Sequence, residues 1–255
     1  MKSKLIAGAA VGAAVLVGAA IGQPAWAEEQ QIEQPGTQPV MAQAPNPTGD
    51  SVQDFSRWQI RVRALGVITD TSAATVNVPA APALNSPASG LSVTNSVVPE
   101  LDISYFFTKN LAAELILGVT QHFIAGTGAL RGVSVGSTWV LPPTLTLQWH
   151  VTELGAFQPY FGVGLNYSVF FSQQASNTTA NNGLGVTSLG INNAWGFAAQ
   201  LGFDYMINRN WGINFDVKKL LLMPTYSATV NNTIPINGTA TLNPWLIGAG
   251  VTYRF

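Results

Sequence analysis

Residues 245–255 constrain the fold more than any other segment of the chain. Odd positions from Trp245 to Phe255 are apolar or aromatic, and even positions after Leu246 are small or polar. A period of two predicts a β-strand with one face against an apolar environment. The length is close to the roughly 9–11 residues that a tilted strand needs to cross a bilayer. In lipid such a strand must pair back with the first strand, because an open edge would leave backbone polar groups unsatisfied.

Composition excludes several other classes of protein. Charged residues make up 9% of the 255 residues, against about 25% in soluble domains. No segment of the mature chain is apolar over the length of a helical span, so the low charge favours a membrane β-barrel. The net charge of −1 argues against nucleic acid as a partner. The absence of cysteine excludes disulfides and thiolate metal sites, and the sequence predicts no metal site or cofactor.

The N-terminal segments are expected to lie outside the barrel. Residues 1–27 read as a signal peptide: Lys2 and Lys4 precede an apolar run, and Ala25-Trp26-Ala27 forms a small-x-small cleavage site. A retained helical anchor is the alternative, but the run is short and rich in Gly and Ala. Residues 28–54 are rich in Pro and Gln without apolar periodicity, which predicts a disordered periplasmic leader. The barrel is expected over residues 55–255.

Alternation recurs in seven further segments, which predicts an all-β fold: an eight-stranded antiparallel transmembrane β-barrel. Short turns are expected near Lys109, Glu153 and Asn210, and long loops over residues 70–96, 125–142, 172–193 and 224–243. Strict alternation of short periplasmic turns and long extracellular loops is typical of outer-membrane barrels. The outward aromatic residues fall into two bands, as expected at the two membrane interfaces. A soluble lipocalin-like barrel would instead keep apolar residues inside.

The charged residues share the inward face of the predicted strands. Arginine facing lipid at mid-depth would cost about 2–4 kcal/mol, so these side chains should face the lumen. Reflection about the short turns sets Asp102 opposite Ile116, and Gln200 opposite Lys218. An eight-stranded barrel is only wide enough for side chains to fill, which favours an ion-pair plug over an ion-conducting path. The expected plug comprises Arg61, Arg63, Glu100, Asp102, Glu114, Asp204, Asp216 and Arg254, with Lys218 beside it.

The chain also resembles the OmpW/AlkL family of outer-membrane proteins, from about residue 92 to the end. The order and spacing of several short stretches carry the resemblance: Leu141-Pro142-Pro143-Thr144-Leu145, Pro159-Tyr160, Asn166-Tyr167, Phe170-Phe171, Trp195-Gly196, Asp204-Tyr205, Ile207-Asn208-Arg209, Pro244-Trp245 and Tyr253-Arg254-Phe255. The resemblance implies a narrow, largely hydrophobic pocket open to the outside, from which small hydrophobic molecules leave sideways into the membrane. The family's narrowing is formed by a Leu and a Trp, and the matching positions here are Ile116 and Lys218. Lysine there removes an aromatic lid and adds a charge.

The expected route of the permeant runs through the upper lumen. Ile116, Phe170, Trp139 and Leu141 should line it, with Lys218 at the narrowing. Pro142 and Pro143 cannot donate to a strand ladder, so a lateral opening is expected beside them.

Two other classes of function remain as alternatives. An enzyme would need a nucleophile and a base in one place; His122 and Ser168 share a parity, but nothing completes a site. A structural or surface-binding barrel, of the adhesion or phage-receptor type, would carry long strands beyond the membrane. The expected partners are outer-membrane lipid and lipopolysaccharide of a Gram-negative bacterium, a small hydrophobic permeant, and the barrel-assembly machinery, which would read Tyr253 and Phe255.

Overall fold

The computed structural model describes residues 56–180 and 183–255. The predicted signal peptide (1–27) and leader (28–54) lie outside the described residues. Within the described ranges, no helix has both the length and the hydropathy of a membrane span.

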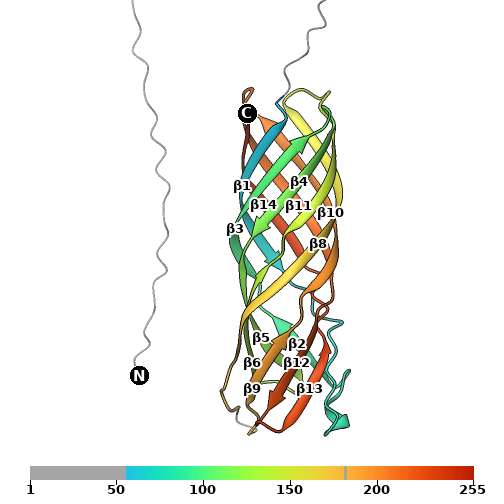
Figure 1. Ribbon diagram of the computed structural model, residues 1–255, viewed down its shortest axis with the longest axis vertical. Helices are drawn as coiled ribbons and strands as arrows, with labels where there is room; N and C mark the ends of the chain where they lie inside the picture. Colours follow the sequence, from blue (N-terminus) through green and yellow to red (C-terminus); the bar gives the residue numbers. More distant parts are fainter. Residues whose placement is uncertain (1–55, 181–182) are drawn as a thin grey trace, which may run out of the picture. The chain divides into compact units, whose positions relative to one another are not determined.

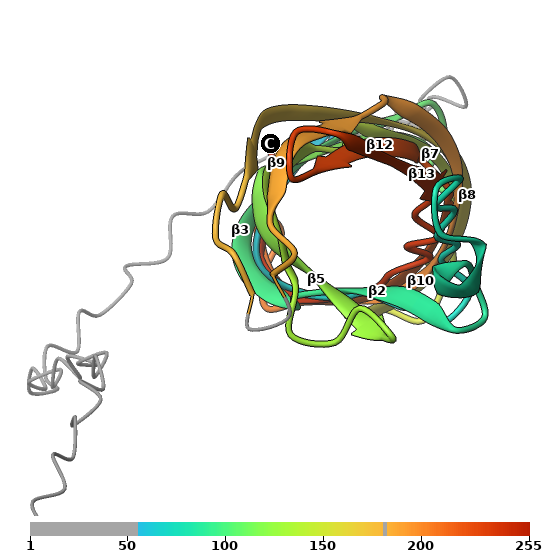
Figure 2. The same ribbon diagram turned by 90° about the horizontal axis from the view of Figure 1, so that it is seen from below.

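Eight antiparallel strands form a closed barrel, as the alternation predicts (Figures 1 and 2). Two of them are interrupted, so that β4 continues into β5 and β6 into β7. Pairing of β8 with β10 closes the ring. In chain order the barrel strands are β1 (Trp58–Ile68), β3 (Ser96–Phe106), β4 (Leu111–Gly118) with β5 (Thr120–Gly128), β6 (Ser134–Leu141) with β7 (Thr144–His150), β8 (Phe157–Ala175), β10 (Ala194–Met206), β11 (Trp211–Leu222) and β14 (Trp245–Arg254).

Strand pairing follows the expected register. The last strand, β14, pairs with β1 from Ile68↔Trp245 to Gln59↔Arg254, so the first and last strands leave no open edge in lipid. Asp102 lies opposite Ile116, and Gln200 lies opposite Lys218. Both predicted pairs are therefore confirmed.

Side-chain burial alternates along the barrel strands. Val163, Phe197 and Leu201 are 65–67% exposed on the outside, whereas Arg61 inside is fully buried. Such an inverted arrangement, apolar outside and polar inside, suits a barrel whose solvent is lipid.

The long connections contain more regular structure than expected. Four strands and a short 3-10 helix lie within the predicted loops, and β5 and β6 also extend into them: β2 (Ser89–Val93), η1 (Pro82–Leu84), β9 (Val186–Ile191), β12 (Thr225–Val230) and β13 (Ile234–Thr239). Together they build an extension at the end opposite the C-terminus (Figure 1). Their outward positions are mostly Ser, Thr, Gly and Asn, and their inward positions include Tyr226 and Ile236, so the alternation is polar outside and apolar inside, the reverse of the membrane strands. This is why the loop assignment for these segments is wrong.

Candidate functional site: an apolar cavity above a charged plug

The half of the lumen nearer the short turns is filled by a network around Arg61, whose side chain points inward from β1. Its guanidinium binds Asp204 through two nitrogens, Nε at 3.1 Å and Nη2 at 2.7 Å. It also forms an ion pair with Glu114. Gln148 and Gln200 donate to the other oxygen of Glu114 at 2.5 and 3.0 Å. Amide donors thus satisfy the carboxylate atoms that the arginine does not reach.

The half of the plug nearer the extension is organised around Arg63, one inward position further along β1. Its guanidinium pairs with Glu100 at 2.8 Å and with Asp102. Lys218 Nζ lies 3.1 Å from Glu100 and 2.7 Å from Asp216. These side chains are 0–2% exposed. Charges buried this deeply are tolerated when they are paired and hydrogen-bonded. Every charge of this network has an ion-pair partner, but Arg63 Nε and Asp102 Oδ1 have no hydrogen-bond partner among the described residues.

Arg254 does not join the ion pairs of the plug, contrary to the expectation. Its guanidinium donates to the side-chain oxygens of Gln59 at 2.9 Å and Gln158 at 3.0 Å, and it lies over the ring of Phe106. Arg254 is the last residue of β14, and it forms no ion pair among the described residues.

An apolar cavity, here called the barrel cavity, lies next to the plug on the side of the extension. Its volume is about 60 Å³, which is space for several water-sized groups, since one water needs roughly 10–15 Å³. Glu100 and Lys218 form its floor, and Ile116 and Leu65 belong to its walls. The change from charge to hydrocarbon occurs within one strand, because Arg63 is followed on the inward face by Leu65 and Val67.

The wall of the barrel cavity is interrupted beside Pro142. Pairing of β4 with β7 ends at Ile116↔Thr144, and pairing of β5 with β6 begins at Thr120↔Val140. The residues between them have no ladder partners on that side. On the other side, Pro142 and Pro143 are held to β8, since Asn166 Nδ2 donates to their carbonyl oxygens at 3.1 and 3.3 Å.

Three residues expected in the upper lumen lie elsewhere. Trp139 is on the outer face of β6 and is 38% exposed, and Leu141 shares its parity; neither lines the barrel cavity. Both belong to a strand rather than a loop, and the inward position between them is Val140. Phe170 faces inward and is buried, but it packs in the apolar cluster that continues into the extension.

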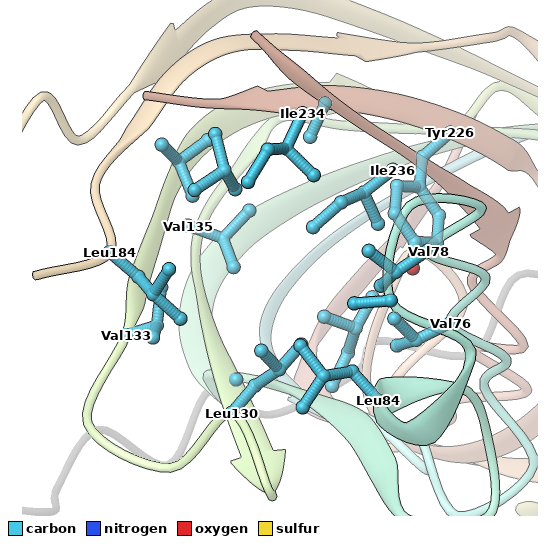
Figure 3. A pocket seen from close by; sticks show the side chains of 16 residues that line it. Val76, Val78, Leu84, Leu130, Val133, Val135, Leu184, Tyr226, Ile234 and Ile236 are labelled. Atoms are coloured by element: carbon cyan, nitrogen blue, oxygen red, sulfur yellow. The ribbon is translucent and has the colours of Figure 1, made fainter. Parts of the chain in front are cut away.

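A second apolar cavity, the extension cavity, lies inside the extension. It also measures about 60 Å³. Figure 3 shows side chains of Val135, Ile234 and Ile236 converging on it, together with Leu130 and Tyr226. Burial raises the pKa of Tyr226 to about 12, and its hydroxyl donates to the carbonyl oxygen of Thr75 at 2.9 Å. The only hydroxyl in the lining is thus satisfied, and the cavity surface is hydrocarbon.

The sequence interpretation missed Asn166 and the lining of both cavities. Asn166 has inward parity on β8 and is fully buried, but nothing local indicates that its amide faces the two prolines. The short patterns Val76-x-Val78 and Ile234-x-Ile236 were the available signals for the extension cavity, since each repeats with the strand period.

The outer surface carries the remaining predicted residues. Tyr253 and Phe255 pack edge to face with ring centroids 5.0 Å apart, and Phe255 is exposed; their role in assembly stays a prediction. Lys219 also lies on the outer face, in the regular pairing of β11 with β14 opposite Trp245. Its ammonium reaches the carbonyl oxygen of Asn243 and lies 4.7 Å from the ring centroid of Trp245.

Comparison with known proteins identifies a family model and several relatives that match this chain. Residues 56–255 match the family model described as the OmpW family. The chain is 51% identical over 201 residues to the outer-membrane protein y4mB of Sinorhizobium fredii, covering 79% of this chain and 81% of that protein. It is 33% identical over 173 residues to outer membrane protein W of Vibrio cholerae, with coverages of 66% and 77%.

A solved structure agrees with the fold. The crystal structure of OprG from Pseudomonas aeruginosa superimposes with a TM-score of 0.69 at 26% identity, covering 79% of this chain and 96% of OprG. The chain therefore belongs to the OmpW family, whose members are non-enzymatic β-barrels of the Gram-negative outer membrane.

Proposed function

We propose that the barrel is a passive channel for small hydrophobic molecules, which enter through the extension and leave sideways beside Pro142. The observation that carries this proposal is the position of the barrel cavity. Its floor is charged, and its walls are mostly apolar, although Thr120, His122, Thr144 and Ser168 also line it. Its lining includes Pro142, where the strand ladder is interrupted.

Transfer energetics favour the sideways route over the straight one. An apolar molecule moving down the lumen would have to separate buried ion pairs, and a buried charge without its partner costs about 3–5 kcal/mol. Moving from the cavity into lipid exchanges one apolar environment for another, so the hydrophobic effect sets little barrier. The continuous apolar cluster from Leu130 in the extension to Val140 and Leu222 in the barrel provides the upper part of the path.

Filling the barrel cavity tests the proposal. A Cβ built at Gly118 would lie 3.6 Å from its nearest neighbour, the carbonyl oxygen of Pro99. The backbone therefore leaves room for the Cβ of Gly118→Leu, and the rest of the leucine side chain would fill the cavity that Gly118 lines. The matched control is Val119→Leu, one residue further on the exposed outer face. Uptake of a labelled small hydrocarbon into cells should fall with G118L and remain unchanged with V119L. Equal uptake by both variants contradicts the proposal.

A second candidate function rests on the extension. Strands β9, β12 and β13 form a sheet of their own, and regular strands beyond the membrane suit a structural or surface-binding barrel. Their inward side chains, however, surround an apolar cavity rather than only a packed core. Replacing Ile234 and Ile236 with Thr should reduce hydrocarbon uptake in a channel, whereas a surface-binding barrel would retain its binding to cells or phage.

A further inference from the structure

One imidazole belongs to the lining of the barrel cavity. His122 lies on the inward face of β5 and is 6% exposed. It is two inward positions further along the chain than Gly118, which pairs with Glu100 of the cavity floor. The imidazole therefore lies at the end of the cavity away from the charged floor, on the side of the extension.

The ring of His122 is held through one of its two nitrogens. Nδ1 lies 2.7 Å from the backbone carbonyl oxygen of Thr94. A carbonyl oxygen can only accept a hydrogen bond, so Nδ1 carries a proton and donates it. Thr94 is itself tied to β5, because its hydroxyl accepts the backbone N–H of Phe123 at 3.0 Å. The orientation of the ring and the position of its first proton are thus fixed.

The second ring nitrogen, Nε2, is an unused acceptor. His122 takes part in none of the ion pairs of the described residues. Glu100 and Lys218, the ionisable groups of the floor, pair with each other at 3.1 Å. A charged imidazole buried without a partner is strongly disfavoured, so the ring is neutral and Nε2 carries a lone pair. The hydrogen bond to Thr94 is the only one that the ring makes to a described residue.

Thr120 adds a hydroxyl beside the imidazole. It is the preceding inward residue of β5, is 5% exposed and lines the same cavity, and residues two apart on a strand share a face. Its hydroxyl makes no hydrogen bond within the part of the chain that the structure describes. The hydroxyls of Thr144 and Ser168, in contrast, donate within the wall, to Pro142 O at 3.0 Å and to Asn166 Oδ1 at 2.7 Å. One end of the cavity therefore offers a fixed acceptor beside a rotatable hydroxyl.

We propose that the barrel cavity selects small hydrophobic molecules that carry a hydroxyl group, such as phenols and short alcohols, and that His122 recognises this group. The inference rests on the proposed function and narrows it, since the preferred permeant is an amphiphile rather than a plain hydrocarbon. The ligand hydroxyl donates to His122 Nε2 and accepts from Thr120, while the hydrocarbon part lies against Leu65 and Ile116. A hydrocarbon that displaces water from Nε2 leaves a buried acceptor unsatisfied, and an alcohol of the same shape does not.

Phenol and toluene test this assignment, because they have the same size and differ in a hydroxyl against a methyl group. The full chain, labelled with ¹⁵N at histidine and ¹³C at the isoleucine methyl groups, is reconstituted in nanodiscs and titrated with each compound by NMR. The chain has two histidines, and His150, fully buried in the plug, is the internal control. The methyl group of Ile116 reports occupation of the cavity by either compound. Phenol should shift the Nε2 resonance of His122 upfield, as a lone pair does on accepting a hydrogen bond, whereas toluene should not, and His150 should respond to neither.

A variant separates recognition from packing. His122→Phe keeps a ring but removes the acceptor, so the ratio of phenol affinity to toluene affinity should fall about tenfold. Toluene affinity is the control, since a general distortion of the cavity would weaken both compounds. The wild-type titration decides the question even where H122F does not fold.

The outcomes distinguish this inference from the proposed function. If both compounds shift the Ile116 methyl resonance but phenol leaves His122 Nε2 unchanged, or if H122F keeps the wild-type ratio, recognition by His122 is wrong and the hydrophobic route stands. If neither compound shifts the Ile116 resonance, the cavity admits no such molecule and both proposals fail.

Discussion

The ammonium of Lys218 lies 2.7 Å from the carboxylate of Asp216, its neighbour on the inward face of β11. Lys218 also belongs to the floor of the barrel cavity, so it stands at the boundary between the charged and the apolar halves of the lumen. The family resemblance puts a tryptophan at this position. Here Lys218 takes its place, and its ammonium is ion-paired with Glu100 and Asp216 of the plug.

Replacing Lys218 with Met should destabilise the folded barrel. The substitution removes the 2.7 and 3.1 Å ion pairs to Asp216 and Glu100 and leaves carboxylates short of a partner in a dry site, at a cost of about 3–5 kcal/mol. Urea unfolding in lipid, followed by tryptophan fluorescence, measures the loss. Lys219→Met is the control: its ammonium is on the outer face, and we expect a loss of about 1 kcal/mol or less. Similar losses in both variants would mean that the buried pairs contribute nothing specific.

Gly250 should be required for closure of the barrel. A Cβ at this position would lie against the carbonyl oxygen of Val62 and 2.6 Å from the Cα of Arg63, so Gly250→Ala must push β1 away from β14. Gly66→Ala lies in the same pairing of β1 with β14, but its Cβ would be 3.6 Å from the nearest atom, the carbonyl oxygen of Ile247. The folded, heat-modifiable fraction on a gel should fall with G250A and stay near wild type with G66A. A normal folded fraction of G250A would show that the seam tolerates the displacement.

Restoring backbone donors at the wall should slow lateral release. Pro142→Val with Pro143→Thr supplies two backbone N–H groups. These donors would let the strand made of β6 and β7 pair without interruption with the strand made of β4 and β5. Hydrocarbon uptake into cells should decrease. Asp102→Asn with Asp216→Asn should instead change ion conductance in planar bilayers more than uptake, because these residues lie in the plug. Uptake that survives the proline replacement but is abolished by the asparagine pair would place the route down the lumen.

Labelling of single cysteines should define the orientation of the barrel. The chain has no native cysteine, so each introduced thiol is unique. Asn232→Cys lies in the exposed turn between β12 and β13, and Lys109→Cys lies in the exposed turn between β3 and β4. A membrane-impermeant maleimide should label intact cells through position 232 only. Labelling at position 109 from outside would reverse the assignment of the two ends.

The sequence alone determined which face of each membrane strand is polar and which strands are neighbours across the short turns. Alternation with a period of two follows from strand geometry, and a tight turn fixes the register of its two strands, as Asp102↔Ile116 and Gln200↔Lys218 demonstrate. The inward direction of Arg61 and Asp204 is a consequence of the same period.

The tertiary structure decided which inward residues meet. Arg61 and Asp204 are 143 positions apart and touch across the lumen, a contact that depends on the stagger of all the strands between them. The same stagger directs Asn166 at the two prolines and brings Arg254 to the short-turn end of the barrel instead of the plug. Parity gives a side chain its face, but only closure of the barrel, with its fixed tilt and shear, gives it a height and an opposite partner.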